Sequence, residues 1–166
     1  MTVQNQHNLT GATSILPTPR RYSLFGTILT ILAERAGTAG HYDLIEGETP
    51  AGLQTPPHRH TRYSELLYVI DGELTIWTAD RNVILHTGES FSIDTGVPHV
   101  VAATGQRTAR GLVIASPSGF AALIEQAGIP ESNGGFREPT PADLERFNQL
   151  ATEFGDEILG QPGDLP

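Results

Sequence analysis

Short apolar runs separated by glycine, proline and polar residues fill the first two thirds of this 166-residue chain. Residues 21–33 alternate in polarity well enough for one or two strands. The apolar runs 66–70 and 74–77 flank Asp71-Gly72, a dipeptide that favours tight turns, so we predict a hairpin there. Further strands are predicted at residues 41–46, 83–85, 90–93, 97–103 and 108–115. Strands at this spacing, with no helix between them, indicate an all-β sandwich or barrel.

Helical periodicity appears only in the last third of the chain. Ser116 followed by Pro117 predicts a helix start, and Gly128 predicts its end. Thr140 and Gly155 bound a second predicted helix in the same way. The apolar faces of the two helices are predicted to be Phe120, Leu123, Ile124 and Ala127, and then Leu144, Phe147, Ala151 and Phe154. We therefore expect a flexible N-terminal arm (1–14), a β-barrel (15–115) and a helical extension (116–166) packed on the barrel.

Composition narrows the chemistry. The chain has no cysteine, and all ten of its basic residues are arginine. Disulfides, thiolate ligands and lysine nucleophiles are therefore excluded. A net charge of −9 argues against nucleic-acid or anionic-membrane partners. With no segment of about 20 apolar residues and no secretory signal pattern, we expect a soluble, cytoplasmic protein.

Three histidines and one glutamate have the spacing of a metal site. His58 and His60 lie two residues apart, so in a strand both project from the same face. Glu65 follows on the next stretch of chain, and His99 can arrive from a strand distant in sequence. Burying these groups together is costly unless a metal or shared protons compensate. We predict that the four residues bind one divalent transition metal. Nitrogen and oxygen ligands suit iron, manganese, cobalt, nickel, copper or zinc, so the identity of the metal stays open.

The residues around this cluster carry a family resemblance. The two blocks are Gly52, His58, His60, Glu65 and Gly72, and then Gly88, Gly96 and His99. They resemble the paired motifs of the cupin superfamily, although Asp94 and Ala103 stand where proline and asparagine are usual. The wider sequence resembles small single-domain cupins similar to bacterial quercetin 2,3-dioxygenases. The resemblance implies a double-stranded β-helix, the cupin jelly-roll barrel, followed here by the two C-terminal helices.

The same resemblance implies a metal-dependent, quercetinase-like dioxygenase. Such an enzyme would act with O2 on a flavonol or a similar enolisable aromatic or polyketide-type molecule, with Glu65 as both ligand and catalytic base. One alternative is a non-oxidative isomerase, cyclase or lyase that uses the metal as a Lewis acid. Others are a small-molecule-binding cupin without catalysis, and a cupin that keeps the motif but works without metal.

Several other residues carry weaker expectations. Phe25 and Phe91 are candidates for the substrate pocket, with core packing as the alternative for each. Arg59 alternates away from the neighbouring histidines and is expected to form a salt bridge on the opposite side. Tyr63 is expected in a solvated loop, with a place at the pocket rim as the alternative. Residues 66–70 are apolar on both faces, which together with the resemblance predicts a homodimer.

Overall fold

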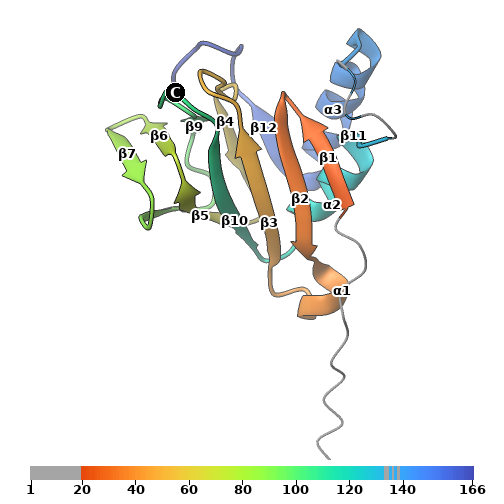
Figure 1. Ribbon diagram of the computed structural model, residues 1–166. Helices are drawn as coiled ribbons and strands as arrows, with labels where there is room; N and C mark the ends of the chain where they lie inside the picture. The colour runs from red at the N-terminus through yellow and green to blue at the C-terminus, as the bar shows by residue number, and fades with distance from the viewer. Residues whose placement is uncertain (1–19, 133–134, 136, 138) are drawn as a thin grey trace, which may run out of the picture.

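The computed structural model describes residues 20–132, 135, 137 and 139–166, and it contains two antiparallel β-sheets (Figure 1). The seven-stranded sheet has the order β11 (Ile129–Pro130), β1 (Arg20–Leu24), β2 (Thr27–Ala33), β3 (Asp43–Thr49), β10 (Ala109–Ser116), β5 (Ser64–Asp71), β8 (Ser90–Ile93). The five-stranded sheet has the order β12 (Asp156–Ile158), β4 (His58–His60), β9 (His99–Ala102), β6 (Glu73–Thr78), β7 (Asn82–His86). The predicted all-β jelly-roll fold is confirmed. The predicted arm, residues 1–14, lies outside the described residues.

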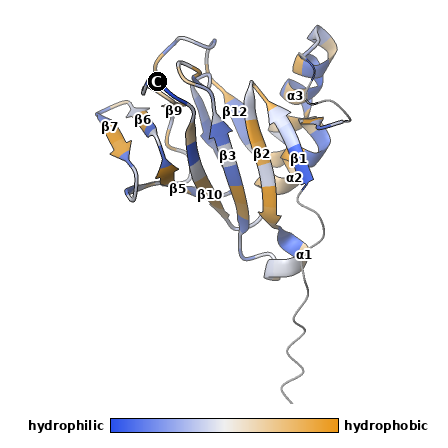
Figure 2. Cartoon of the chain, viewed as in Figure 1, coloured by the Kyte–Doolittle hydropathy of each residue, from blue (hydrophilic) through white to orange (hydrophobic). Residues whose placement is uncertain are grey.

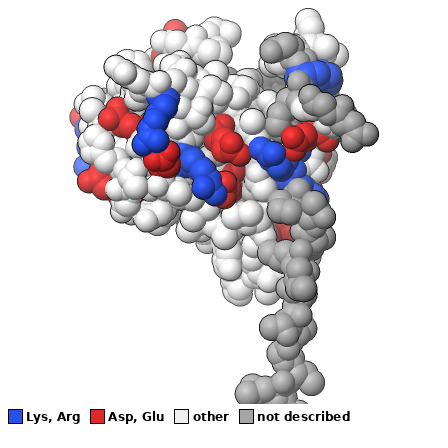
Figure 3. Space-filling model, viewed as in Figure 1, with Lys and Arg blue, Asp and Glu red and all other residues white. Residues whose placement is uncertain are grey.

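Alternation along the strands builds the core between the two sheets. On β5, Leu67 and Val69 are buried and pack with Leu74 of β6, which belongs to the other sheet. Each such side chain contributes roughly 1.5–3 kcal/mol through its removal from water. The outer face of the seven-stranded sheet is polar in its upper part, where β3 is hydrophilic along most of its length (Figure 2). Acidic and basic side chains interleave across this face (Figure 3), as in the pairs Arg21–Glu48 and Arg110–Glu46.

The hairpin predicted around Asp71-Gly72 is wrong. β5 and β6 follow each other in sequence but belong to different sheets: β5 pairs with β10 and β8, whereas β6 pairs with β7 and β9. Gly72 does take a positive φ of 84°. At this corner a Cβ would lie 2.9 Å from the Cα of Ala109, so the chain crosses between the sheets where only glycine fits.

The helices are α1 (Arg35–Thr38), α2 (Phe120–Ala127) and α3 (Pro141–Phe154). The predicted helix boundaries at Gly128, Thr140 and Gly155 are confirmed, and Thr140 forms a capping box with Asp143. Ser116 does not cap a helix, because it is the last residue of β10 and its hydroxyl donates to the carbonyl of His41. Leu144 was predicted on the apolar face of the second helix but is exposed. The buried face of α3 is carried by Phe147 and Ala151.

The segment after residue 116 adds strands as well as helices, which the sequence did not indicate. β11 pairs with β1 at the edge of one sheet, and β12 pairs with β4 at the edge of the other. Between them, α2 and α3 pack together through Leu123, Ala127 and Phe147, against Leu24 and Phe25 of the barrel. Among the described residues, no helix combines the length and apolar composition needed to cross a bilayer.

Candidate metal centre

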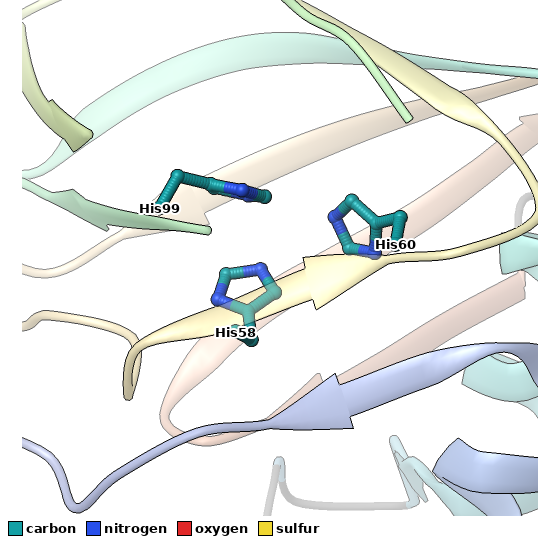
Figure 4. Close-up of side chains that lie close together, drawn as sticks. All are labelled: His58, His60 and His99. Carbon is teal, nitrogen blue, oxygen red and sulfur yellow. The ribbon is translucent and has the colours of Figure 1, made fainter. Parts of the chain in front are cut away.

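Three histidines converge from two neighbouring strands of the five-stranded sheet. His58 and His60 lie on β4, and His99 opens β9, where it stands directly opposite His58 in the strand register. The three rings point toward one another (Figure 4), and their ligand atoms all lie within 4.8 Å of each other. Three histidines so placed could hold a metal ion.

Each imidazole is fixed through its Nδ1 atom. The Nδ1 of His58 lies 2.9 Å from the carbonyl of Pro56, and that of His99 lies 2.9 Å from the carbonyl of Val97. The Nδ1 of His60 is hydrogen-bonded to Oδ1 of Asp156. Because a carbonyl or carboxylate oxygen accepts, each Nδ1 carries the proton and Nε2 is the atom available to a metal.

Glu65 reaches the cluster from the facing sheet. It lies on β5, and its Oε2 is 3.5 Å from Nε2 of His60 and 3.3 Å from Nε2 of His99. Among the described residues these three buried atoms have no hydrogen-bond partner. Orphaned lone pairs of this kind are costly, and a divalent metal would satisfy them. The donor set of three nitrogens and one carboxylate therefore fits the expected metal.

The surroundings shift the pKa values of these groups in different directions. Burial, followed by the charges of His99 and His60, lowers the pKa of His58 to about 3. Burial also acts to lower the pKa of His60, but the hydrogen bond to Asp156 and the nearby carboxylate of Glu65 outweigh it and raise that pKa to about 9. Burial acts to raise the pKa of Glu65, yet His60 and His99 bring it well below its usual range. Glu65 is therefore ionised beside the imidazoles.

Two residues at the centre had no clear signal in the sequence. Tyr63 is fully buried rather than in a solvated loop, because its ring stacks on His60 at 4.5 Å and its hydroxyl donates to Asp156. Asp156 follows a predicted helix stop, and its pairing with β4 depends on a contact between residues far apart in sequence. Arg59 lies as expected on the other side of β4, where it pairs with Glu157 at 2.7 Å.

A cavity of about 130 Å³ opens onto His58, His60 and Glu65. Its wall is mostly apolar and, among the described residues, includes no arginine. Phe25 lies in this wall with a left-handed φ of 50°, and its ring packs edge-on against Phe147 at 4.5 Å. Such a backbone conformation costs roughly 1 kcal/mol or more in a non-glycine residue.

Phe91, the other candidate for the substrate pocket, does not line this cavity. It packs against the core cluster between the sheets, and Arg81 lies over its ring at 5.3 Å. The core-packing alternative describes its position.

Residues 46–115 match the cupin domain family. Within the chain, 69 residues are 26% identical to quercetin 2,3-dioxygenase of Bacillus subtilis (strain 168). That match covers 42% of this chain and 20% of the Bacillus protein. The chain therefore contains a cupin domain. It is a small cupin that resembles the quercetinases.

Solved structures agree with this class. The polyketide cyclase RemF from Streptomyces resistomycificus is 29% identical, with a TM-score of 0.50 over 55% of this chain and 66% of that one. KdgF from Halomonas sp. shares the fold at 17% identity, with a TM-score of 0.55 over 62% of this chain and 91% of that one.

Proposed function

We propose that this protein is a metal-dependent, quercetinase-like dioxygenase that acts with O2 on a flavonol or a similar enolisable aromatic molecule. The observation that carries the proposal is the position of Glu65, an ionised carboxylate that faces three histidines at the end of an apolar cavity. The similarity to the Bacillus quercetin 2,3-dioxygenase supports the same reaction class.

Each part of the site has a distinct task in this proposal. Nε2 atoms of His58, His60 and His99 would hold the metal, with Glu65 as a fourth ligand. When bound, the metal supplies Lewis acidity to a substrate oxygen. Glu65 accepts the proton of the substrate hydroxyl, and the resulting enolate is the electron-rich species that reacts with O2. A ligated carboxylate is a weak base, so this role requires Glu65 to be reversibly bound.

The cavity wall supports an uncharged, largely apolar substrate. Leu67, Leu74 and Val101 contribute to the wall from the sheets, and Phe120 contributes from α2. Besides the histidines, the ionisable side chains that the described residues contribute to this wall are Glu65 and Asp156, and both are acidic. Apart from the histidines of the proposed metal site, a carboxylated or phosphorylated substrate would meet no basic side chain in this lining, so an aromatic molecule with hydroxyl groups fits the cavity better.

A glutamine at position 65 tests the proposed base. Glu65→Gln preserves size and one ligating oxygen but removes the proton acceptor. The variant should keep much of its metal and lose about a hundredfold or more in the rate of flavonol turnover. Glu89→Gln changes an exposed glutamate away from the site and is the matched control. Both atoms of labelled dioxygen should enter the ring-opened product. Turnover under strict anaerobiosis, or none in air with any of the six metals, would overturn the proposal.

A non-oxidative cyclase is the second candidate. The observation that favours it is the 29% identity to the polyketide cyclase RemF. In that case the same histidines and the same apolar cavity would bind a flexible polyketide, and Glu65 would remove a proton ahead of ring closure. Turnover of a polyketide-type substrate without oxygen uptake would select this candidate over the first.

A further inference from the structure

Asp156 joins the metal centre from the C-terminal segment. It is the first residue of β12, stands opposite His60 in the pairing of β12 with β4, and is 3% exposed. Its Oδ1 accepts from Nδ1–H of His60 and from the hydroxyl of Tyr63, the latter at 2.7 Å. Its Oδ2 is buried without a hydrogen-bond partner among the described residues. A buried carboxylate with one unsatisfied oxygen is a poor stabiliser of a fold, so its position calls for another explanation.

His60 differs from the other two histidines in how its ring is held. His58 and His99 are each fixed by a backbone carbonyl two residues earlier, which no substitution of those residues removes. The ring of His60 is instead fixed by the side chain of Asp156, 96 residues away in sequence, and by the stacked ring of Tyr63. Its orientation therefore depends on the docking of the C-terminal strand.

We propose that Asp156 is a positioning residue for metal binding, anchored by Tyr63. It holds His60 with Nδ1 protonated and Nε2 directed at His58 and His99, and its negative charge increases the basicity of that ligand. The C-terminal strand, which lies beyond the matched cupin residues 46–115, is thus part of the metal centre. The inference rests on the proposed histidine site but not on the reaction performed there.

Zinc affinity measured by competition with a chelating dye tests this role. Asp156→Asn keeps the shape and an accepting oxygen but removes the charge, and it should weaken Zn²⁺ binding by about ten- to hundredfold. Tyr63→Phe keeps the stacked ring and removes the hydroxyl, so it should give a smaller loss in the same direction. Glu157→Gln is the matched control: it removes a charge from the next residue of the same strand, at the exposed pair with Arg59. Zinc affinity of Asp156→Asn within twofold of this control would overturn the proposal.

The imidazole N–H protons of the zinc-loaded protein separate positioning from general loss of structure. In the wild-type protein the Nδ1–H proton of His60, donated to a carboxylate, should resonate further downfield than those of His58 and His99. In Asp156→Asn this resonance should move upfield while the other two stay in place. A global disturbance would shift all three, and an unchanged His60 resonance would also refute the role. If Asp156→Asn does not fold, zinc affinity and the imidazole N–H resonances of Tyr63→Phe test the proposal instead. Zinc affinity and the imidazole resonances can both be measured even if the protein turns over no flavonol. Failure of the proposed reaction can therefore be distinguished from failure of the proposed role of Asp156.

Discussion

His58 and His60 lie two residues apart on one strand, yet their environments favour opposite charge states. His58 faces two other imidazoles and no carboxylate as close as those beside His60, so burial and repulsion keep it neutral, with a pKa of about 3. His60 lies between Asp156 and Glu65, which keep it protonated to a pKa of about 9 when no metal competes. A single pair of residues thus makes the stability of the metal-free protein depend on pH in both directions.

The metal-free protein should be most stable near pH 6.5. The unfolded chain protonates His58 below about pH 6.5 while the folded chain does not, so stability is lost as pH falls from there toward 3. His60 binds its proton more tightly in the folded state, so its contribution is complete below pH 6.5 and is lost as pH rises to 9. The two pKa shifts correspond to roughly 5 kcal/mol for His58 and roughly 3 kcal/mol for His60. Urea unfolding of chelator-treated protein at pH 5, 6.5 and 9 measures both effects, with the exposed His86→Gln as control. A free energy of unfolding that rises steadily from pH 5 to pH 9 would contradict the expected maximum.

Replacement of His99 should remove most of the bound metal. His99→Ala deletes one of the three Nε2 donors and leaves the pair on β4 with Glu65, a smaller donor set that should bind the metal more weakly. Elemental analysis should show a sharp fall in metal content, while circular dichroism shows that the β-fold is retained. His86→Ala, at an exposed position on β7, should keep wild-type metal content. Full stoichiometric metal in His99→Ala would show that the assignment is wrong.

At the scale of elements, α2 is held by a carboxylate from a strand. Asp43 is fully buried on β3 and accepts from the backbone N–H groups of Gly119 and Ala121, at 2.8 and 2.9 Å, and from the hydroxyl of Ser118. These donors lie at the N-terminus of the helix, where a negative charge is favourable. The contact fixes the helix that brings Phe120 to the cavity wall.

Asp43→Ala should therefore cost about 3 kcal/mol in the free energy of unfolding, because it leaves buried donors without a partner. Urea denaturation measures the loss. Asp71→Ala removes another carboxylate of the same sheet, but from an exposed pair with Arg107, and it should change stability by less than about 1 kcal/mol. Equal effects from the two substitutions would contradict a capping role for Asp43.

Helix boundaries that depend on neighbouring residues could be predicted from the sequence. The capping box at Thr140 and the stops at Gly128 and Gly155 are set by neighbouring residues, and the structure has them where expected. The turn at Gly72 was recognised but its partner strands were not, since pairing depends on which sheet can bury each strand. β12 was missed for the same reason: three residues carry no periodicity, and their partner is β4.

The residues of the site also fall into two groups: those that a local sequence pattern predicts and those that only the folded chain brings together. The spacing of His58 and His60 on one strand requires that they share a face, and the motif includes Glu65 and His99. Asp156 belongs to no local pattern. Tyr63 lies in the segment between two strands, where the sequence gives no sign that it is buried. Its burial results from ring stacking on His60 and a hydrogen bond to Asp156, and both contacts exist only in the folded chain.

At the scale of the whole molecule, the C-terminal segment completes the barrel that the cupin domain begins. It extends both sheets, through β11 and β12, and contributes Phe147 and Ile158 to the cavity wall. The cavity is therefore a joint product of the domain and its extension. The seven-stranded sheet also has an outer face, on which Tyr68 of β5 is 38% exposed.

An apolar row on that outer face supports a homodimer. Ile114 on β10 stands opposite Leu44 of β3 on one side and Leu66 of β5 on the other, and Tyr68 follows two residues along β5. These four side chains point away from the core, and Tyr68 is 38% exposed. The pair Arg110–Glu46 borders the row and provides a polar rim. A patch of this kind suits a second copy related by a two-fold axis, since each subunit then buries the same surface.

Tyr68→Arg should convert this dimer to a monomer. The substitution places a charge beside the apolar row, and burying that charge in the proposed interface is costly. Light scattering at micromolar concentration should give twice the chain mass for the wild-type protein and the chain mass for the variant. Ile84→Arg changes another exposed apolar residue, on β7 in the other sheet, and should stay dimeric. A wild-type protein that is already monomeric at this concentration would count decisively against the homodimer, and a dimeric Tyr68→Arg would place the interface on another face.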